Sequence, residues 1–160
     1  MRAWFTVFFA AWVLWLALTV PWQPAQILAG ALVAALAAIF VRPLLPAGFT
    51  GPGPAAILRF LLFVPVFLVE MVKANFQIAR VVLHPALPMR PRLLTAKTEL
   101  TSDVGRTLLA NAITLTPGTL TVDAEGDELL IHCVNPTPEQ EAEPRLLLHP
   151  FEDHIRRFAP

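Results

Sequence analysis

Residues Ala3–Val20, AWFTVFFAAWVLWLALTV, form an uncharged stretch of 18 residues. As a helix this stretch would rise about 27 Å, close to the roughly 30 Å thickness of a bilayer's hydrocarbon layer. Trp4 and Trp22 lie at its two ends, and indole rings favour the membrane–water boundary. The stretch therefore predicts a first membrane-spanning helix. A cleaved signal peptide is the alternative, but its apolar core usually has only about 7–15 residues.

A second uncharged stretch, Ala25–Val41, follows after the short connection Pro21–Pro24. Gly30, Ala34 and Ala38 recur in it every four residues, which places them on one face of a helix. Small residues at this spacing let two helix backbones approach closely in lipid, so the two stretches together predict a helical hairpin. The alternative is that alanine is merely abundant in this stretch.

Beyond the Gly- and Pro-rich loop Arg42–Pro54, the stretch Ala55–Leu83 predicts a third helix, whose apolar run Phe60–Val69 has only 10 residues. Polar residues then follow at spacings of three, four and three, within about 80° of one helix face. This polar stripe consists of Glu70, Lys73, Gln77 and Arg80. The pattern suits a helix that starts in lipid and then leaves the membrane or lies against another subunit.

Glu70 is the one carboxylate close to the predicted membrane region. A carboxylate inside a membrane is by default a candidate for an ion path. Lys73 lies one helical turn away and can pair with it. The sequence favours this structural pair over a place on an ion path.

The composition of the whole chain fits a membrane protein. Of its 160 residues 56% are hydrophobic and 15% charged, against roughly 45–50% and about 25% in soluble domains. Basic and acidic residues balance at 12 each, which argues against a nucleic-acid partner. Only Arg2, Arg42 and Arg59 carry charge before Glu70, so the chain predicts a membrane half followed by a water-exposed half.

The predicted fold class is a membrane protein of mixed α+β type. Its expected parts are a transmembrane helical region at 1–84, with helices at 3–20, 25–41 and 55–83, a Pro-rich linker at 85–91, and a small module at 92–160. Within the module the patterns predict the order β-α-β-β-α. The expected elements are a strand at Arg92–Leu100, a helix from Ser102 or Asp103 to about Ala112, strands at Leu120–Asp123 and Leu129–Val134, a surface loop at Pro136–Pro144 and a helix at His149–Phe158.

Catalytic and metal-binding patterns are sparse. His132 and Cys133 are neighbours in a predicted strand, so their side chains point to opposite faces and do not readily share a metal. His149 and His154 are five residues apart, a poor spacing for one helix face. The sequence has no Gly-rich phosphate loop, HExxH motif or nucleophile elbow, and its single cysteine excludes an internal disulfide. We therefore expect no enzyme activity, cofactor or metal ion.

The segment Asn111–Thr121, NAITLTPGTLT, is the most distinctive part of the second half. Pro117 and Gly118 fit the two central positions of a type II turn, because Pro presets φ and Gly accepts a positive φ. The neighbouring threonines can bind either the local backbone or polar groups of a partner. Physical reasoning alone predicts a well-formed turn between a helix and a hairpin.

The string Ala110–Val122, ANAITLTPGTLTV, closely resembles the signature of the E-type subunit of the Mrp-type multisubunit cation/proton antiporters, which typically reads ANSITLTPGT. Ala112 stands where Ser is common in that family, and Cys133 where Trp is common. The resemblance covers essentially the whole chain. It implies that the signature residues are subunit contacts, namely Asn111, Thr114, Thr116, Pro117, Gly118 and Thr119.

The resemblance also implies a function. Such complexes lie in the bacterial inner membrane and exchange cytoplasmic Na⁺ or another monovalent cation for external H⁺. The E-type subunit is expected to be an accessory member for assembly and activity, whose partners are the other subunits and the lipid bilayer. The alternative is an unrelated small membrane anchor whose module binds a cytoplasmic partner.

Three spans would place the two termini on opposite sides of the membrane. More basic residues follow the third predicted span than precede it, and positive charge favours the cytoplasmic side. The residues concerned are Lys73, Arg80, Arg90, Arg92, Lys97 and Arg106, against Arg2, Arg42 and Arg59. We therefore expect a cytoplasmic C-terminal module and an outward N-terminus.

Overall fold

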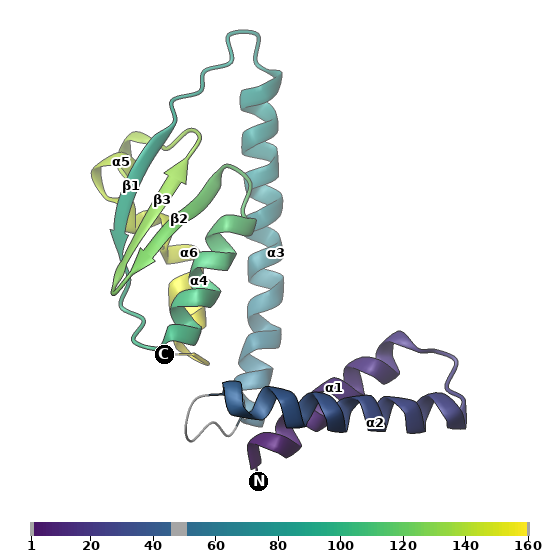
Figure 1. Cartoon of the computed structure of the whole chain (residues 1–160). Helices are drawn as coiled ribbons and strands as arrows, with labels where there is room; N and C mark the ends of the chain where they lie inside the picture. Colours follow the sequence, from purple (N-terminus) through teal and green to yellow (C-terminus); the bar gives the residue numbers. More distant parts are fainter. Residues whose placement is uncertain (1, 46–50, 160) are drawn as a thin grey trace. The chain divides into compact units, whose positions relative to one another are not determined.

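The computed structural model describes residues 2–45 and 51–159 (Figure 1). By their contacts these residues form two compact units, Met1–Gly53 and Pro54–Pro160. The sequence-based division placed the third helix in the membrane region 1–84. In the structure that helix belongs to the same compact unit as residues 92–160.

The first unit is a helical hairpin of α1 (Arg2–Leu18) and α2 (Pro24–Val41), which continues into the short helix η1 (Arg42–Leu44). The buried residues of α2 are the small ones that the spacing singled out, Gly30, Ala34 and Ala38. A Cβ atom on Gly30 would lie 2.3 Å from Cδ1 of Trp15, so glycine is what allows the indole of α1 to pack there. The predicted hairpin and its small-residue contact face are thus confirmed.

Two described helices are long and apolar enough to cross a membrane by length and composition, at Pro24–Leu44 and at Pro54–Leu83. The apolar part of α1, Trp4–Leu18, is shorter. With its full 17 residues, α1 reaches the lower end of the roughly 17–25 residues that cross a bilayer.

The second unit consists of α3 (Pro54–Leu83) and a small α+β module beside it (Figure 1). Strands β1 (Arg92–Lys97), β2 (Thr119–Glu125) and β3 (Glu128–Cys133) form an antiparallel sheet in the order β1-β3-β2. A register shift between Thr121 and Asp123 marks a bulge in β2. Helices α4 (Asp103–Leu115) and α6 (His149–Arg156) pack against each other and share the module's core with the sheet. The expected mixed α+β fold class is confirmed.

The structure corrects one expected element of the module. The loop predicted at Pro136–Pro144 instead contains the short helices α5 (Pro138–Ala142) and η2 (Pro144–Leu147). Thr137 caps α5 and exchanges hydrogen bonds with Gln140, which is the capping box of a helix start. The acidic and polar composition suggested a loop, and the T-x-x-Q signature was the stronger signal.

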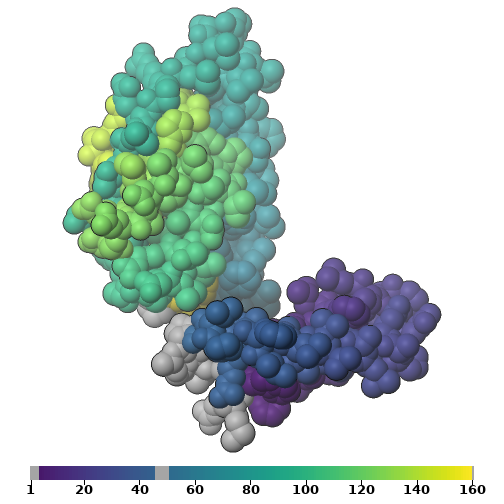
Figure 2. All heavy atoms as spheres, in the orientation of Figure 1, coloured from purple at the N-terminus to yellow at the C-terminus, as the bar shows by residue number. Residues whose placement is uncertain are grey.

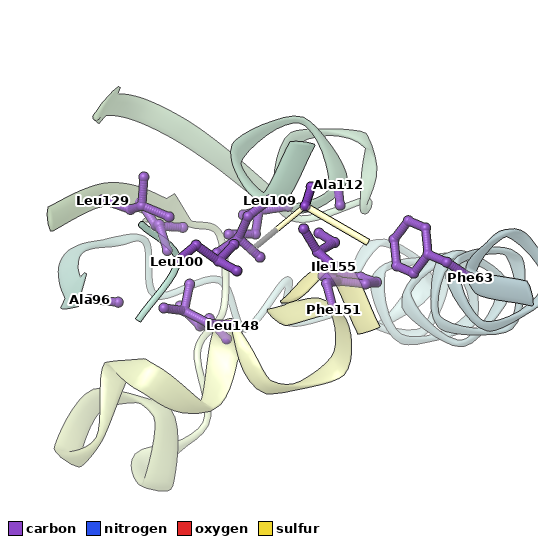
Figure 3. Packing of buried hydrophobic residues seen from close by; sticks show 13 residues of the cluster. Phe63, Ala96, Leu100, Leu109, Ala112, Leu129, Leu148, Phe151 and Ile155 are labelled. Carbon is purple, nitrogen blue, oxygen red and sulfur yellow. The ribbon is translucent and has the colours of Figure 1, made fainter. Parts of the chain in front are cut away.

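The core of the second unit is built by both the module and α3. The ring centroid of Phe63, from α3, lies 6.3 Å from that of Phe151 and 5.9 Å from that of Phe158. Figure 3 shows Phe63 pointing from α3 toward Phe151 and Ile155 of α6. The module therefore depends on α3 for part of its core.

A buried carboxylate joins α6 to the end of β1. Glu152 has an exposed fraction of only 2%, and its Oε1 accepts hydrogen bonds from the Thr98 hydroxyl and the Glu99 amide, both at 2.6 Å. Arg145 and Arg156 approach its other oxygen at 3.6 and 3.9 Å. Glu152 thus has several partners, as a buried charge requires.

Candidate functional site

The two groups of residues that the sequence singled out meet in one pocket of about 420 Å³ between α3 and the module. From the polar stripe of α3 the pocket includes Glu70, Lys73 and Gln77. From the signature segment it includes Thr116, Pro117, Gly118 and Thr119. Nothing in the sequence indicated that these two groups lie next to each other.

Glu70 and Lys73 form the predicted ion pair at the rim of this pocket. The distance from Lys73 Nζ to Glu70 Oε1 is 2.7 Å, and the Lys73 side chain is 60% exposed against 29% for Glu70. Such exposed helix pairs typically contribute only a few tenths of a kcal/mol. Glu70 is the one carboxylate among the lining residues.

The signature segment forms the tight turn that its Pro-Gly pair predicts. Gly118 has a φ of +93°, and the amide of Thr119 donates to the Thr116 carbonyl at 3.2 Å. Both features match a type II turn with Pro117 and Gly118 at its centre. The turn connects α4, which ends at Leu115 rather than near Ala112, to β2.

The threonine hydroxyls of this segment bind backbone groups within the module. Thr116 Oγ1 donates to the Ala112 carbonyl at 2.8 Å, and Thr119 Oγ1 donates to the Ile113 carbonyl at 2.7 Å. These bonds add to the backbone hydrogen bond of the last turn of α4, in which the Thr116 amide donates to the Ile113 carbonyl at 3.1 Å. The threonines therefore fix the shape of the turn.

The turn approaches α3 through Gly118. A Cβ atom at this position would lie 2.7 Å from Cδ1 of Ile78. The backbone carbonyl of Gly118 accepts a hydrogen bond from the Val134 amide at 2.9 Å, which ties the turn to the end of β3. Apolar side chains of Ile113, Leu147 and Phe151 line the pocket together with these polar groups.

Three of the sequence-predicted residues are not among those lining the pocket. Asn111 borders a different depression beside α4, together with Asp103 and Arg106. Thr114 is exposed, and its Oγ1 accepts from the Thr121 amide at 3.1 Å. Arg80 is also exposed, one turn beyond Gln77.

Sequence reasoning missed several polar residues of the pocket, because they lie just before or within the segment Pro136–Pro144, which was taken for a loop. These residues are Asn135, Thr137 and Gln140. The capping box at Thr137 was the signal that could have placed them. Cys133 also lines the pocket, and burial raises the pKa of its thiol, so the thiol is neutral at pH 7.

No group of three or more His, Cys, Asp or Glu side chains that could hold a metal ion occurs in residues 2–45 and 51–159. The pocket offers one ion pair, amides and hydroxyls around an apolar floor.

Comparison with known proteins gives consistent matches. The family model described as Na+/H+ ion antiporter subunit matches residues 8–158. The E1 subunit of the Na(+)/H(+) antiporter of Staphylococcus saprophyticus subsp. saprophyticus is similar to this chain, with 34% identity over 134 residues that cover 82% of each protein.

Two solved structures contain similar chains. A chain of the membrane-bound sulfane sulfur reductase, an archaeal respiratory membrane complex, is 35% identical and matches 98% of both chains with a TM-score of 0.86. A chain of the Mrp complex from Dietzia sp. DQ12-45-1b is 29% identical over 62% of this chain and 94% of that chain, with a TM-score of 0.44.

Proposed function

Because the chain belongs to the family of E-type subunits of Na+/H+ antiporters, we propose that it is an accessory subunit that supports the assembly of a multisubunit cation/proton antiporter in the membrane. Its partners are the other subunits of that complex. In this proposal, exchange of Na⁺ or another monovalent cation for H⁺ takes place in those other subunits.

The proposal rests on the contacts that the signature residues make. The hydroxyls of Thr116 and Thr119 bind the end of α4, and Gly118 packs against Ile78 of α3. The one carboxylate of the pocket, Glu70, is held by Lys73. These residues shape a surface between α3 and the module, which supports a role in binding a neighbouring subunit.

A similar chain in a respiratory complex is a further argument. Two complexes with different names share a subunit of the same fold. A subunit that recurs in both kinds of complex is consistent with a role in holding subunits together.

Removal of the chain tests the proposal. We expect that a strain without it accumulates little of the complete complex, measured by native gel electrophoresis, and loses exchange in inverted vesicles to the same degree. A complete and fully active complex without the chain would contradict the proposal.

A tagged chain purified in mild detergent provides a second test. Mass spectrometry should recover the other antiporter subunits in stable proportions. Recovery of a water-soluble cytoplasmic protein instead would favour the alternative of a small membrane anchor.

We also place the C-terminal module in the cytoplasm and the complex in the bacterial inner membrane. The supporting argument is the excess of basic residues around and after the end of α3, including Arg80, Arg90 and Arg92. A reporter that is active only in the cytoplasm, fused after Pro160, should be active. An inactive reporter on a stably inserted chain would contradict this orientation.

A further inference from the structure

We propose that α3 lies along the membrane surface instead of crossing it, with one face in the lipid boundary and the other against the module, so that only α1 and α2 cross the bilayer. The length and composition of α3 alone would permit a span. The contacts of its two faces argue otherwise.

One face of α3 is occupied by the module along nearly the whole helix. Near its start, Arg59 donates a hydrogen bond to the Arg157 carbonyl at 2.5 Å. Near its end, Val81 lines the pocket beneath the signature turn. These positions are 22 residues apart, or about 33 Å along a helix. Figure 2 shows the atoms of the module meeting those of α3 over most of this length.

This length decides against a span. A hydrocarbon layer is roughly 30 Å thick, so a spanning α3 would carry the module's polar groups into lipid. The adjoining helix α6 contains Glu152, Asp153, His154 and Arg156. Charged residues inside a bilayer are rare, and irregular backbone facing lipid does not occur there.

The opposite face of α3 is apolar and uncovered within this unit. Six side chains on it fall within about 120° of the helix circumference, and each is between 46% and 65% exposed. They are Leu58, Leu61, Leu62, Leu68, Val72 and Phe76. The residues that contact the module, such as Phe63 and Ile78, lie on the other side of the helix. We call the six residues the outer face.

The composition of the outer face favours lipid over another helix. Helices that pack closely in membranes use small residues, as α2 does with Gly30 and Ala34 against α1. The six residues of the outer face are large aliphatic and aromatic side chains, and Pro65 and Ala79 are the small residues within the same 120°. Lys73 and Arg80 flank it, where a basic residue meets anionic headgroups.

Spin labels on single cysteines test the proposal in the complete complex. A Cys133→Ala background removes the chain's one cysteine, and labels replace Leu58, Leu68 or Phe76. We expect high collision rates with oxygen, which concentrates in lipid, and one shallow depth for all three labels. As a control, Val122→Cys on β2 should collide mainly with a water-soluble nickel complex.

Other outcomes would overturn the proposal. A depth profile that is deepest at Leu68 and shallower on both sides would show that α3 crosses the membrane. Low collision rates with both reagents would show that a neighbouring protein covers the outer face.

The number of spans gives an independent test. Two spans place Gln23, between α1 and α2, on the opposite side of the membrane from Val122, whereas three spans place them on the same side. An impermeant maleimide should therefore label Gln23→Cys and Val122→Cys from opposite sides, in intact cells and inverted vesicles respectively. Labelling of both from the same side would overturn the proposal.

Discussion

Gly118 and Ile78 meet at the point where the signature turn touches α3, so closely that a Cβ atom on Gly118 would lie 2.7 Å from Cδ1 of Ile78. The contact joins two residues that are 40 positions apart in the sequence. Because Gly118 has no side chain, the backbone of the turn packs directly on α3.

Gly118→Val should reduce the amount of assembled complex severalfold. Valine is strongly disfavoured at a φ of +93°, and its side chain would also push against Ile78. Gly126→Val is the matched control, because Gly126 has a φ of +59° but no atom lies within 4 Å of where its Cβ would be. Native gels measure the amount of assembled complex, and exchange rates are measured in the same vesicles. Normal assembly with slow exchange in the Gly118 variant would mean that the turn acts in transport itself.

Glu70→Gln should leave cation/proton exchange largely intact. Glutamine keeps the size and hydrogen-bonding capacity of Glu70, and the lost ion pair with Lys73 costs only a few tenths of a kcal/mol. Lys73→Gln is the control, since it breaks the same pair from the other side. Exchange per assembled complex in inverted vesicles is the measurement. A complex that assembles but does not exchange when Glu70 alone is changed would place this carboxylate on the ion path.

Gly30→Val should prevent the hairpin from closing. A Cβ atom there would lie 2.3 Å from Cδ1 of Trp15, so α1 and α2 would have to separate, and overpacking of this kind costs about 1–3 kcal/mol. Leu32→Val, at an exposed position two residues further along α2, should have little effect. The amount of chain in washed membranes measures both variants. Equal amounts would show that the hairpin tolerates a wider separation.

The module should lose stability as the pH falls into the acid range, in part because of Glu99. Its hydrogen bond and charge interaction with Arg145 lower the pKa of the Glu99 carboxyl. A lowered folded-state pKa contributes stability that is fully present above the unfolded value, about 4.3, and is lost as the pH drops below it.

Thermal unfolding of the purified full chain in detergent at pH 7 and at about pH 3.5 measures this effect. Glu99→Gln should lower the midpoint temperature of unfolding at pH 7. It should also make the difference between the midpoints at pH 7 and about pH 3.5 smaller than in the unchanged chain. Glu125→Gln, in the hairpin between β2 and β3, should leave the drop as it is in the unchanged chain. An unchanged acid drop in the Glu99 variant would show that other carboxylates account for it.

Local patterns in the sequence were sufficient for most of the elements, though not for α5 and η2, and for the turn. The four-residue spacing of Gly30 and Ala34 identified the contact face of α2, and Pro117-Gly118 identified the type II turn. The contact face and the turn each depend only on residues that are close together in the sequence, so a single stretch of sequence is enough to predict them.

The position of α3 could not be read in the same way. Phe63 and Phe67 lie inside an apolar run that indicated lipid, yet in the structure they contact Phe151. Lipid and a protein core bury the same residue types, so composition does not distinguish the two environments. The meeting of the polar stripe with the signature turn was hidden for a different reason, because the two segments are about 40 residues apart in the sequence.

Glu152 shows a second limit. The sequence predicts a short helix over His149–Phe158 without indicating which of its residues are buried, and the structure buries Glu152 beside Thr98. The hydrogen-bond donors that make this burial possible, the Thr98 hydroxyl and the Glu99 amide, follow β1 and lie more than 50 residues away in the sequence. Such long-range pairing leaves no local signal.

The core that α3 and α6 share has a consequence for synthesis. Phe63 leaves the ribosome 88 residues before Phe151, and at about 5–20 residues per second this delay amounts to roughly 4–18 s. During this time both faces of α3 are bare, one awaiting α6 and the other the bilayer. A nascent chain that stalls in this interval displays an uncovered row of phenylalanines, which is the kind of surface that chaperones and proteases recognise. Unfinished copies would thus be removed before they reach the complex.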